Sequence, residues 1–254
     1  TVRVYSHVSG GSFEELMESC LAEKEKGFTA IGHLSPFLDE PRNTRYFETY
    51  ARKISSGVER IGKIREAVGL DVDLCIENHR RLNPAEAVAL AAQLEPLLPM
   101  FYEDPILPDN FDSMAWVAQK IRIPLATGER IHTPQEYQML VKRQALDYLR
   151  VSIGLCGGFT GAKKISAIAE ANQLGIIPHN PLSPVATAAC IQLDAATPCF
   201  TIQEYPDPND QAAHARFVYD KTNASVFRAC DIVKEMPVCE QGFLLVPKSE
   251  AKRS

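Results

Sequence analysis

Short apolar runs alternate with amphipathic stretches along almost the whole chain. The apolar runs predict strands at Val2–His7, Phe28–His33, Val72–Glu77, Met100–Glu103, Ile123–Thr127, Tyr148–Val151, Ile176–His179 and Phe200–Glu204. The stretches between them have helical spacing and predict helices near 13–26, 45–67, 84–95, 110–119, 134–142, 158–173 and 184–196. Nearly continuous apolar strands that alternate with helices indicate a parallel sheet covered by helices, not a sandwich. We therefore predict an α/β fold, a TIM-like (β/α)7β parallel barrel.

The same pattern indicates one domain. The chain has 254 residues, which is a usual size for a single barrel of this kind. No low-complexity linker separates two units, so we assign residues 1–246 to the barrel domain and 247–254 to a basic tail. The first predicted strand begins almost at the first residue of the sequence.

Composition narrows the class of protein. A hydrophobic content of 45% and a charged content of 23% are ordinary for a globular protein, and the net charge of −5 argues against nucleic acid or an anionic membrane as a partner. No apolar run approaches the roughly 20 residues that span a bilayer. The cysteines lack CxxC spacing, and several lie in apolar segments, so we interpret them as small reduced core residues of a cytoplasmic protein. They are Cys20, Cys75, Cys156, Cys190, Cys199, Cys230 and Cys239.

Three glutamates carry the most specific chemistry in the chain. Glu77, Glu103 and Glu129 stand 26 residues apart (77 to 103 and 103 to 129), and each closes a short apolar run. This spacing corresponds to one strand, one loop and one helix, so three consecutive strands would bring the carboxylates to one rim of the barrel. Converging carboxylates repel one another unless a cation lies between them, and an all-oxygen set suits Mg²⁺. The sequence therefore predicts a metal site at this rim.

Other ionisable residues end the predicted strands as well. A single strand-end glutamate or histidine is commonly a solvated loop residue or a structural group, but the number of such strand ends favours a functional site. The residues are His33 at the end of strand two, His79, Asp104 and Arg130 after strands three to five, Arg150 with the polar Ser152 from strand six, His179 at the end of strand seven and Glu204 at the end of strand eight.

An ordered series of motifs resembles a known family. The segments IENHRRL, FYEDP, ATGER, DYLRVSIGLCGGFTGAKKI, IIPHNPLSPVATAA and FTIQEY resemble the barrel domain of the enolase superfamily, and most of all its acid-sugar dehydratases, the mannonate and galactonate dehydratase branch. The resemblance runs from about Val2 to Val246. It implies that the chain is a carbon–oxygen lyase that removes a proton next to a carboxylate, forms a metal-stabilised enediolate and expels the β-hydroxyl to give a 2-keto-3-deoxy acid.

The resemblance also implies roles for individual residues. Glu77, Glu103 and Glu129 match the metal ligands, although the first is more often Asp in the family. His79 matches the acid toward the departing hydroxyl, and His179 matches an acid–base histidine of the galactonate branch. Substrate-binding positions are matched by three residues, which are Arg150, Glu204 and Glu129.

The general base departs from the family pattern. Many members have a lysine at the end of strand two, where this chain has Gly32 and His33. The strand-six aspartate that holds the strand-seven histidine is replaced by Ser152 or Gly154. Tyr46, flanked by arginines, is a candidate for the base that the mannonate branch uses, but it also fits a simple helix-start aromatic.

These observations define one expectation and its alternatives. We expect a Mg²⁺-dependent dehydratase of a hexonate-type sugar acid, with further copies of the same chain as partners and no nucleic acid or membrane. One alternative is a racemase or epimerase of the same superfamily, which the missing lysine disfavours. Another is a non-catalytic metal-binding relative that has lost its base. Relatives also carry an N-terminal α+β capping domain, so this chain is either a fragment or lacks that lid.

Overall fold

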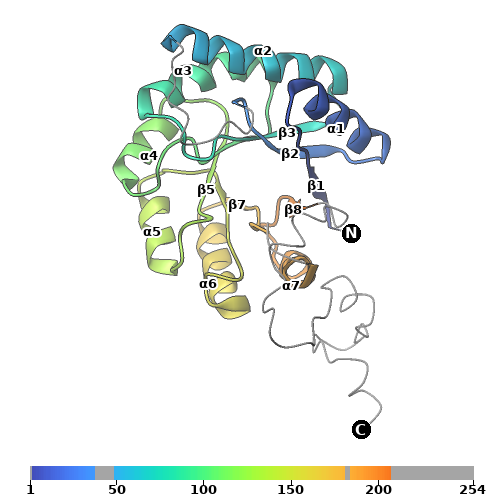
Figure 1. The fold of residues 1–254 in the computed structure, drawn as a ribbon. Coiled ribbons are helices and arrows are strands. Elements are labelled where there is room, and N and C mark those ends of the chain that lie inside the picture. The colour runs from blue at the N-terminus through green and yellow to red at the C-terminus, as the bar shows by residue number, and fades with distance from the viewer. Residues whose placement is uncertain (1, 38–48, 181–183, 207–254) are drawn as a thin grey trace, which may run out of the picture.

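A ring of parallel strands encloses the centre of the molecule, and helices cover its outside (Figure 1). The computed structural model describes residues 2–37, 49–180 and 184–206. The strands are β1 (Val4–His7), β2 (Ala30–Leu34), β3 (Asp73–Glu77), β4 (Phe101–Glu103), β5 (Leu125–Thr127), β6 (Tyr148–Leu149), β7 (Gly175–Ile176) and β8 (Gln203–Tyr205).

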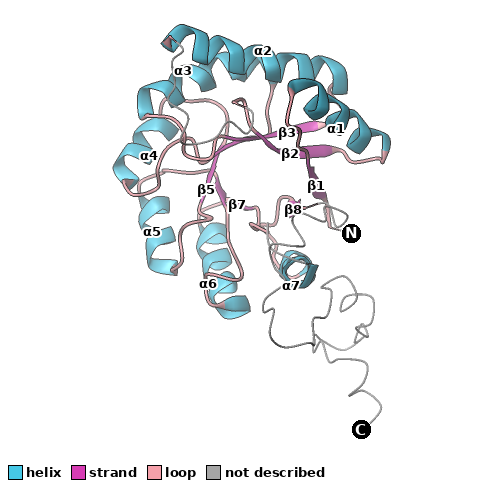
Figure 2. Ribbon diagram, in the orientation of Figure 1, coloured by secondary structure: helices cyan, strands magenta, loops and turns pink. Residues whose placement is uncertain are grey.

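Helices follow the strands in strict alternation, as Figure 2 shows in cyan and magenta. They are α1 (Phe13–Glu25), α2 (Tyr50–Val68), α3 (Pro84–Leu94), α4 (Phe111–Ala118), α5 (Pro134–Lys142), α6 (Gly158–Ala171) and α7 (Pro184–Ala195), with a 3₁₀ turn, η1, at Glu95–Leu97. The predicted α/β class and the alternation of strand and helix are confirmed.

The sheet order establishes the barrel. All strand pairs are parallel, in the order β7-β6-β5-β4-β3-β2-β1-β8. A further parallel bridge joins Ile176 to Phe200, just before β8, and connects the two ends of the sheet. Because every strand runs in the same direction, all carboxyl ends lie at one rim.

Helix starts are defined by local side-chain caps. Asn83 and Glu86 form a capping box at α3, and Thr133 and Glu136 form another at α5. Asn110 caps α4 by accepting hydrogen bonds from two backbone N–H groups. These caps set the lengths of the βα-loops, which carry the rim residues.

Two buried layers support the rim. The larger apolar core lies between helices and strands, with Ile61, Leu74 and Leu90 fully buried. A smaller cluster fills the barrel interior below the rim, with members from seven of the strands or their immediate flanks. These residues are Tyr5, Ala30, Cys75, Phe101, Ala126, Ile177 and Ile202.

Several sequence predictions differ in extent or lie outside the described residues. Strands β6 and β7 are shorter than predicted, although an isolated bridge between Ser152 and His179 continues their pairing. The proposed domain boundary at residue 246 and the basic tail lie outside the described residues, as does Tyr46. The described cysteines, Cys20, Cys75, Cys156, Cys190 and Cys199, are free thiols, and Cys199 is partly exposed. No helix within the described ranges is both long and apolar enough to cross a bilayer.

Candidate metal centre and active site

The three predicted metal ligands meet at the carboxyl rim. Glu77 ends β3 and pairs in register with Glu103, which ends β4, while Glu129 follows β5 by two residues. One carboxylate oxygen from each lies within 4.8 Å of the other two. The residues are 3%, 2% and 8% exposed, respectively. The spacing of 26 residues in the sequence thus corresponds to real convergence in space.

A tight turn positions Glu129. Gly128 adopts φ +136°, and a Cβ there would lie 2.7 Å from the hydroxyl oxygen of Tyr137. That hydroxyl lies 2.8 Å from the carbonyl oxygens of both Gly128 and Arg150, and it can donate to them. Only glycine fits a position that combines this conformation with this close approach. The ATGE segment therefore folds as it does because of one glycine and one tyrosine on α5.

A buried arginine lies beneath the carboxylates. Arg150 is 1% exposed, and its Nε donates to Glu103 while its Nη2 donates to Glu204 Oε2 at 2.6 Å. Its Nη1 donates to the carbonyl oxygens of Ile177 and Pro178. The substrate-binding role of Arg150 stays a prediction, and in the structure its guanidinium contacts two carboxylates and two backbone carbonyl oxygens.

A second arginine enters the cluster from the loop after β3. Arg80 Nη1 donates to Asp104 Oδ2 at 2.6 Å and to Glu129 Oε1 at 2.5 Å. Asp104 also accepts a 2.6 Å hydrogen bond from the Thr127 hydroxyl. The cluster thus contains five carboxylates (Glu77, Glu103, Asp104, Glu129 and Glu204), and Arg130 adds a third guanidinium group, its Nε lying 3.2 Å from Glu129 Oε1.

The two predicted acid–base histidines lie on opposite sides of the ring, because β3 and β7 are four strands apart in a ring of eight. His79 follows β3, and its backbone N–H donates to Glu77 Oε1 at 2.6 Å. His179 follows β7, and its Nε2 lies 3.1 Å from Glu129 Oε2.

The isolated β-bridge between Ser152 and His179 places Ser152, not Gly154, next to this histidine. Ser152 Oγ and His179 Nδ1 are both buried without a hydrogen-bond partner among the described residues.

Burial and mutual repulsion shift the carboxylate pKa values. Desolvation, reinforced by the charges of Glu103 and Asp104, raises the pKa of Glu77 well above its ordinary value. Desolvation raises the pKa of Glu103 to about 8, although Arg150 opposes the shift. Burial is also the largest single effect on Glu129 and acts in the same direction, but the His179 hydrogen bond and the charges of His179, Arg80 and Arg150 together outweigh it and lower the pKa of Glu129.

The donor set fits a hard divalent cation. Three buried carboxylates within 4.8 Å of one another offer oxygen ligands alone, which is the type that Mg²⁺ prefers. The raised pKa values of Glu77 and Glu103 show that two of these carboxylates are costly to ionise without a counter-charge. A bound cation would remove that cost, so the residues present are suited to hold one.

Some neighbouring residues were not given a role from the sequence. His7 ends β1 and its Nε2 lies 2.8 Å from Glu204 Oε1, and Arg80 bridges two carboxylates. His7 ends a predicted strand, as His179 does, so the same reasoning could have identified it. Arg80 could not, because a left-handed backbone with φ +63° turns it into the site.

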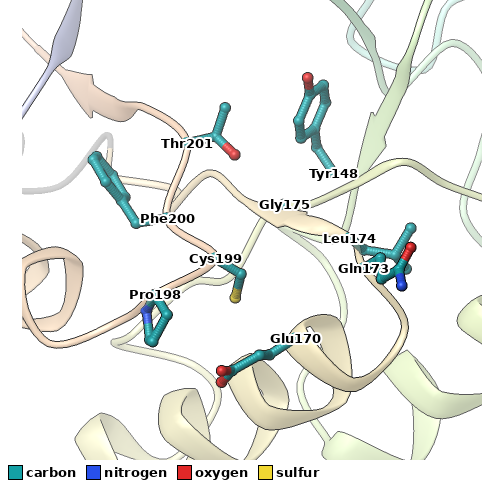
Figure 3. A pocket seen from close by; sticks show the side chains of 9 residues that line it. All are labelled: Tyr148, Glu170, Gln173, Leu174, Gly175, Pro198, Cys199, Phe200 and Thr201. Carbon is teal, nitrogen blue, oxygen red and sulfur yellow. The ribbon is translucent and has the colours of Figure 1, made fainter.

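A separate hollow lies at the opposite end of the strands (Figure 3). It is lined by Tyr148 and Gly175, which begin β6 and β7, together with Glu170 and Cys199. The carboxylate cluster instead lies where the strands end. The hollow is therefore distinct from the candidate active site.

Fold and rim geometry together define a barrel of the enolase type. A model of the family described as "Enolase C-terminal domain-like" matches residues 17–250, and the chain belongs to this family. The D-galactonate dehydratase of Variovorax paradoxus (strain S110) is 35% identical over 207 residues, which are 80% of this chain and 52% of that protein. The chain thus spans about half the length of this curated relative.

Solved structures agree with this assignment. The mandelate racemase/muconate lactonizing enzyme-like protein from Roseovarius sp. TM1035 aligns with a TM-score of 0.76 at 30% identity, over 85% of this chain and 56% of that one. An enolase from Agrobacterium radiobacter, bound to Na and L-malate, aligns with a TM-score of 0.73 at 30% identity, over 80% of this chain and 51% of that one.

Proposed function

We propose that this barrel carries the catalytic residues of a Mg²⁺-dependent dehydratase acting on a hexonate-type sugar acid. The observation that carries the proposal is the convergence of Glu77, Glu103 and Glu129, with a histidine on each side. The three glutamates would hold the ion. When bound, it would supply positive charge for the substrate carboxylate and for the negative charge that develops there.

The two histidines divide the proton transfers in this proposal. Dehydration requires a base facing the carbon next to the carboxylate and an acid facing the β-hydroxyl. In this proposal His79 is the acid that protonates the departing hydroxyl, and His179 is the group that takes the α-proton. Their positions on opposite sides of the ring support this division.

Other residues act through these groups. Arg150 holds Glu103 and Glu204 from below, and Arg80 holds Glu129 and Asp104 from the loop after β3. Glu204 also accepts a 2.6 Å hydrogen bond from the backbone N–H of Asn180, which follows His179. Glu204, together with Glu129, is proposed to orient the hydroxyl groups of the substrate.

The relatives support the substrate class. The matched protein of Variovorax paradoxus is named D-galactonate dehydratase, and the Agrobacterium radiobacter structure holds L-malate, a hydroxy acid. A sugar acid combines a carboxylate with neighbouring hydroxyl groups and so offers the same chemistry. A racemase would require two groups able to exchange the same α-proton, and His79 and His179 leave that reaction as the second candidate.

A substrate screen tests the proposal. The protein would be incubated with Mg²⁺ and a library of aldonic and aldaric acids, and 2-keto-3-deoxy products would be detected with a carbonyl reagent. We expect a product with at least one acid, and a loss of about 100-fold or more in His79→Asn. A matched control is His132→Asn, because His132 is exposed and outside the site. Loss of the α-proton to solvent deuterium without dehydration would favour the racemase, and a folded, Mg²⁺-binding protein inert toward the whole library would contradict the dehydratase.

A further inference from the structure

Three histidines from neighbouring strands form a row along the rim. His7 ends β1, His33 lies in β2, and His79 follows β3. The His7 and His33 rings stack with centroids 4.9 Å apart at 21°. The His33 and His79 rings meet edge to face with centroids 4.6 Å apart at 71°. All three are partly exposed, so the row lines the open end of the barrel.

A β-bulge brings His33 into this row. Ile31 pairs with Leu74 and Leu34 pairs with Ile76, so two residues of β2 oppose one of β3. The bulge contains His33 at φ +57°, a conformation that non-glycine residues rarely adopt. Such bulges redirect a side chain, and strained residues of this kind collect at functional sites. The position before it must be glycine, since a Cβ on Gly32 would lie 2.2 Å from the Tyr5 ring.

The inner end of the row is anchored. His7 Nε2 lies 2.8 Å from Glu204 Oε1. The other oxygen of Glu204 is held at 2.6 Å by both Arg150 Nη2 and the backbone N–H of Asn180. Because Glu204 is buried and doubly held, the His7 ring has a defined place, and the stacked His33 ring follows it.

The outer end of the row lies on irregular backbone. His79 has φ +49° and Arg80 has φ +63°, so the backbone leaves the strand in an irregular loop at the proposed acid. The backbone N–H of His79 is tied to Glu77, but this contact does not set the direction of the ring. The edge-to-face contact with His33 constrains the ring, because an aromatic pair of this geometry has a preferred arrangement.

We propose that His33 is a positioning residue that holds the His79 ring for proton transfer, anchored through His7 to Glu204. This inference rests on the proposed function, in which His79 is the acid. It assigns His33 a role that depends on its ring and not on its nitrogens. An aromatic ring at position 33 should therefore suffice, whereas a side chain without a ring should not.

Two substitutions separate these cases. His33→Asn removes the ring and is suited to the left-handed backbone, which asparagine tolerates. His33→Phe retains a ring without nitrogens. We expect His33→Asn to lower kcat about 10- to 100-fold through a displaced acid, with KM changed less than about threefold. His33→Phe should recover most of that loss, and His132→Asn should leave kcat unchanged.

A structural readout works even if no substrate is found. The nuclear Overhauser contacts of the His79 ring protons with residues other than residue 33, assigned by their absence in His79→Asn, should change in His33→Asn and be retained in His33→Phe. If the parent dehydrates no acid, the proposed function fails while this readout still decides whether His33 holds the ring. Unchanged contacts of the His79 ring in His33→Asn would overturn the inference. A kcat in His33→Phe as low as in His33→Asn, with the stability of the parent retained, would overturn it as well, because an aromatic ring would then not suffice.

Discussion

At the scale of single residues, Glu103 shows how burial and metal binding are linked. Its pKa is raised to about 8 by desolvation, despite the ion pair with Arg150. The pKa of Glu77 is raised as well, because burial removes water from its carboxylate and because the charge of Glu103 repels it. A carboxylate must lose its proton before it can bind a cation, so protons and Mg²⁺ compete for this site.

This competition predicts a pH-dependent affinity. Below the raised pKa of Glu103, binding of Mg²⁺ must displace a proton, and the affinity should rise with pH by up to about tenfold per unit for each proton released. We expect tighter binding at pH 8 than at pH 6, measured by calorimetry in buffers of different ionisation enthalpy to count the protons. An affinity that does not change between these pH values would contradict the assigned pKa shifts.

The sequence predicted which residues lie at the rim, but it did not predict all the contacts that they make there. Glu77, Glu103 and Glu129 follow from spacing alone, because strand ends of a parallel barrel must converge. The substrate role of Arg150 stays a prediction, and the sequence could not show that its guanidinium also binds Glu103 and Glu204. Arg80 was missed because its position depends on a left-handed backbone that no pattern revealed.

At the scale of secondary-structure elements, the sequence predicted nearly every helix and strand. Their extents follow from apolar periodicity, which reflects burial against the barrel. The bulge in β2 was not predicted, since His33 and Gly32 there read as an ordinary strand end. A bulge arises from pairing with β3 and from the space taken by Tyr5, which are both tertiary effects.

The turn between β5 and α5 provides a test at this scale. Gly128→Ala would place a Cβ 2.7 Å from the Tyr137 hydroxyl at φ +136°. We expect a loss of about 1–3 kcal/mol in the free energy of unfolding, from overpacking and backbone strain, together with weaker Mg²⁺ binding as Glu129 moves. Urea denaturation and a Mg²⁺ titration measure the two effects.

Gly62 offers the matched control. It lies within α2, and a Cβ there would meet no atom within 4 Å. Gly62→Ala should therefore leave Mg²⁺ binding unchanged and should stabilise the protein by about 0.4–1 kcal/mol. If both alanine variants behaved alike, the turn at Gly128 would not be what positions Glu129.

At the scale of the whole molecule, the chain is an enolase-type barrel with a cluster of buried ionisable residues at one rim. The family assignment rests on a match over residues 17–250, and the chain spans about half the length of the curated relative described above. Assembly into a homo-oligomer and a cytoplasmic location stay predictions. The central claim concerns the three converging glutamates, which require a counter-charge.

Isothermal titration calorimetry with Mg²⁺, on the parent and on Glu77→Gln, tests that claim most directly. The substitution removes one ligand and also relieves the repulsion that raises the pKa of Glu77. We therefore predict one Mg²⁺ per parent chain, no measurable binding by Glu77→Gln, and a variant at least as stable as the parent in the presence of a chelator. Absence of binding by the folded parent, or equal binding by Glu77→Gln, would contradict the account.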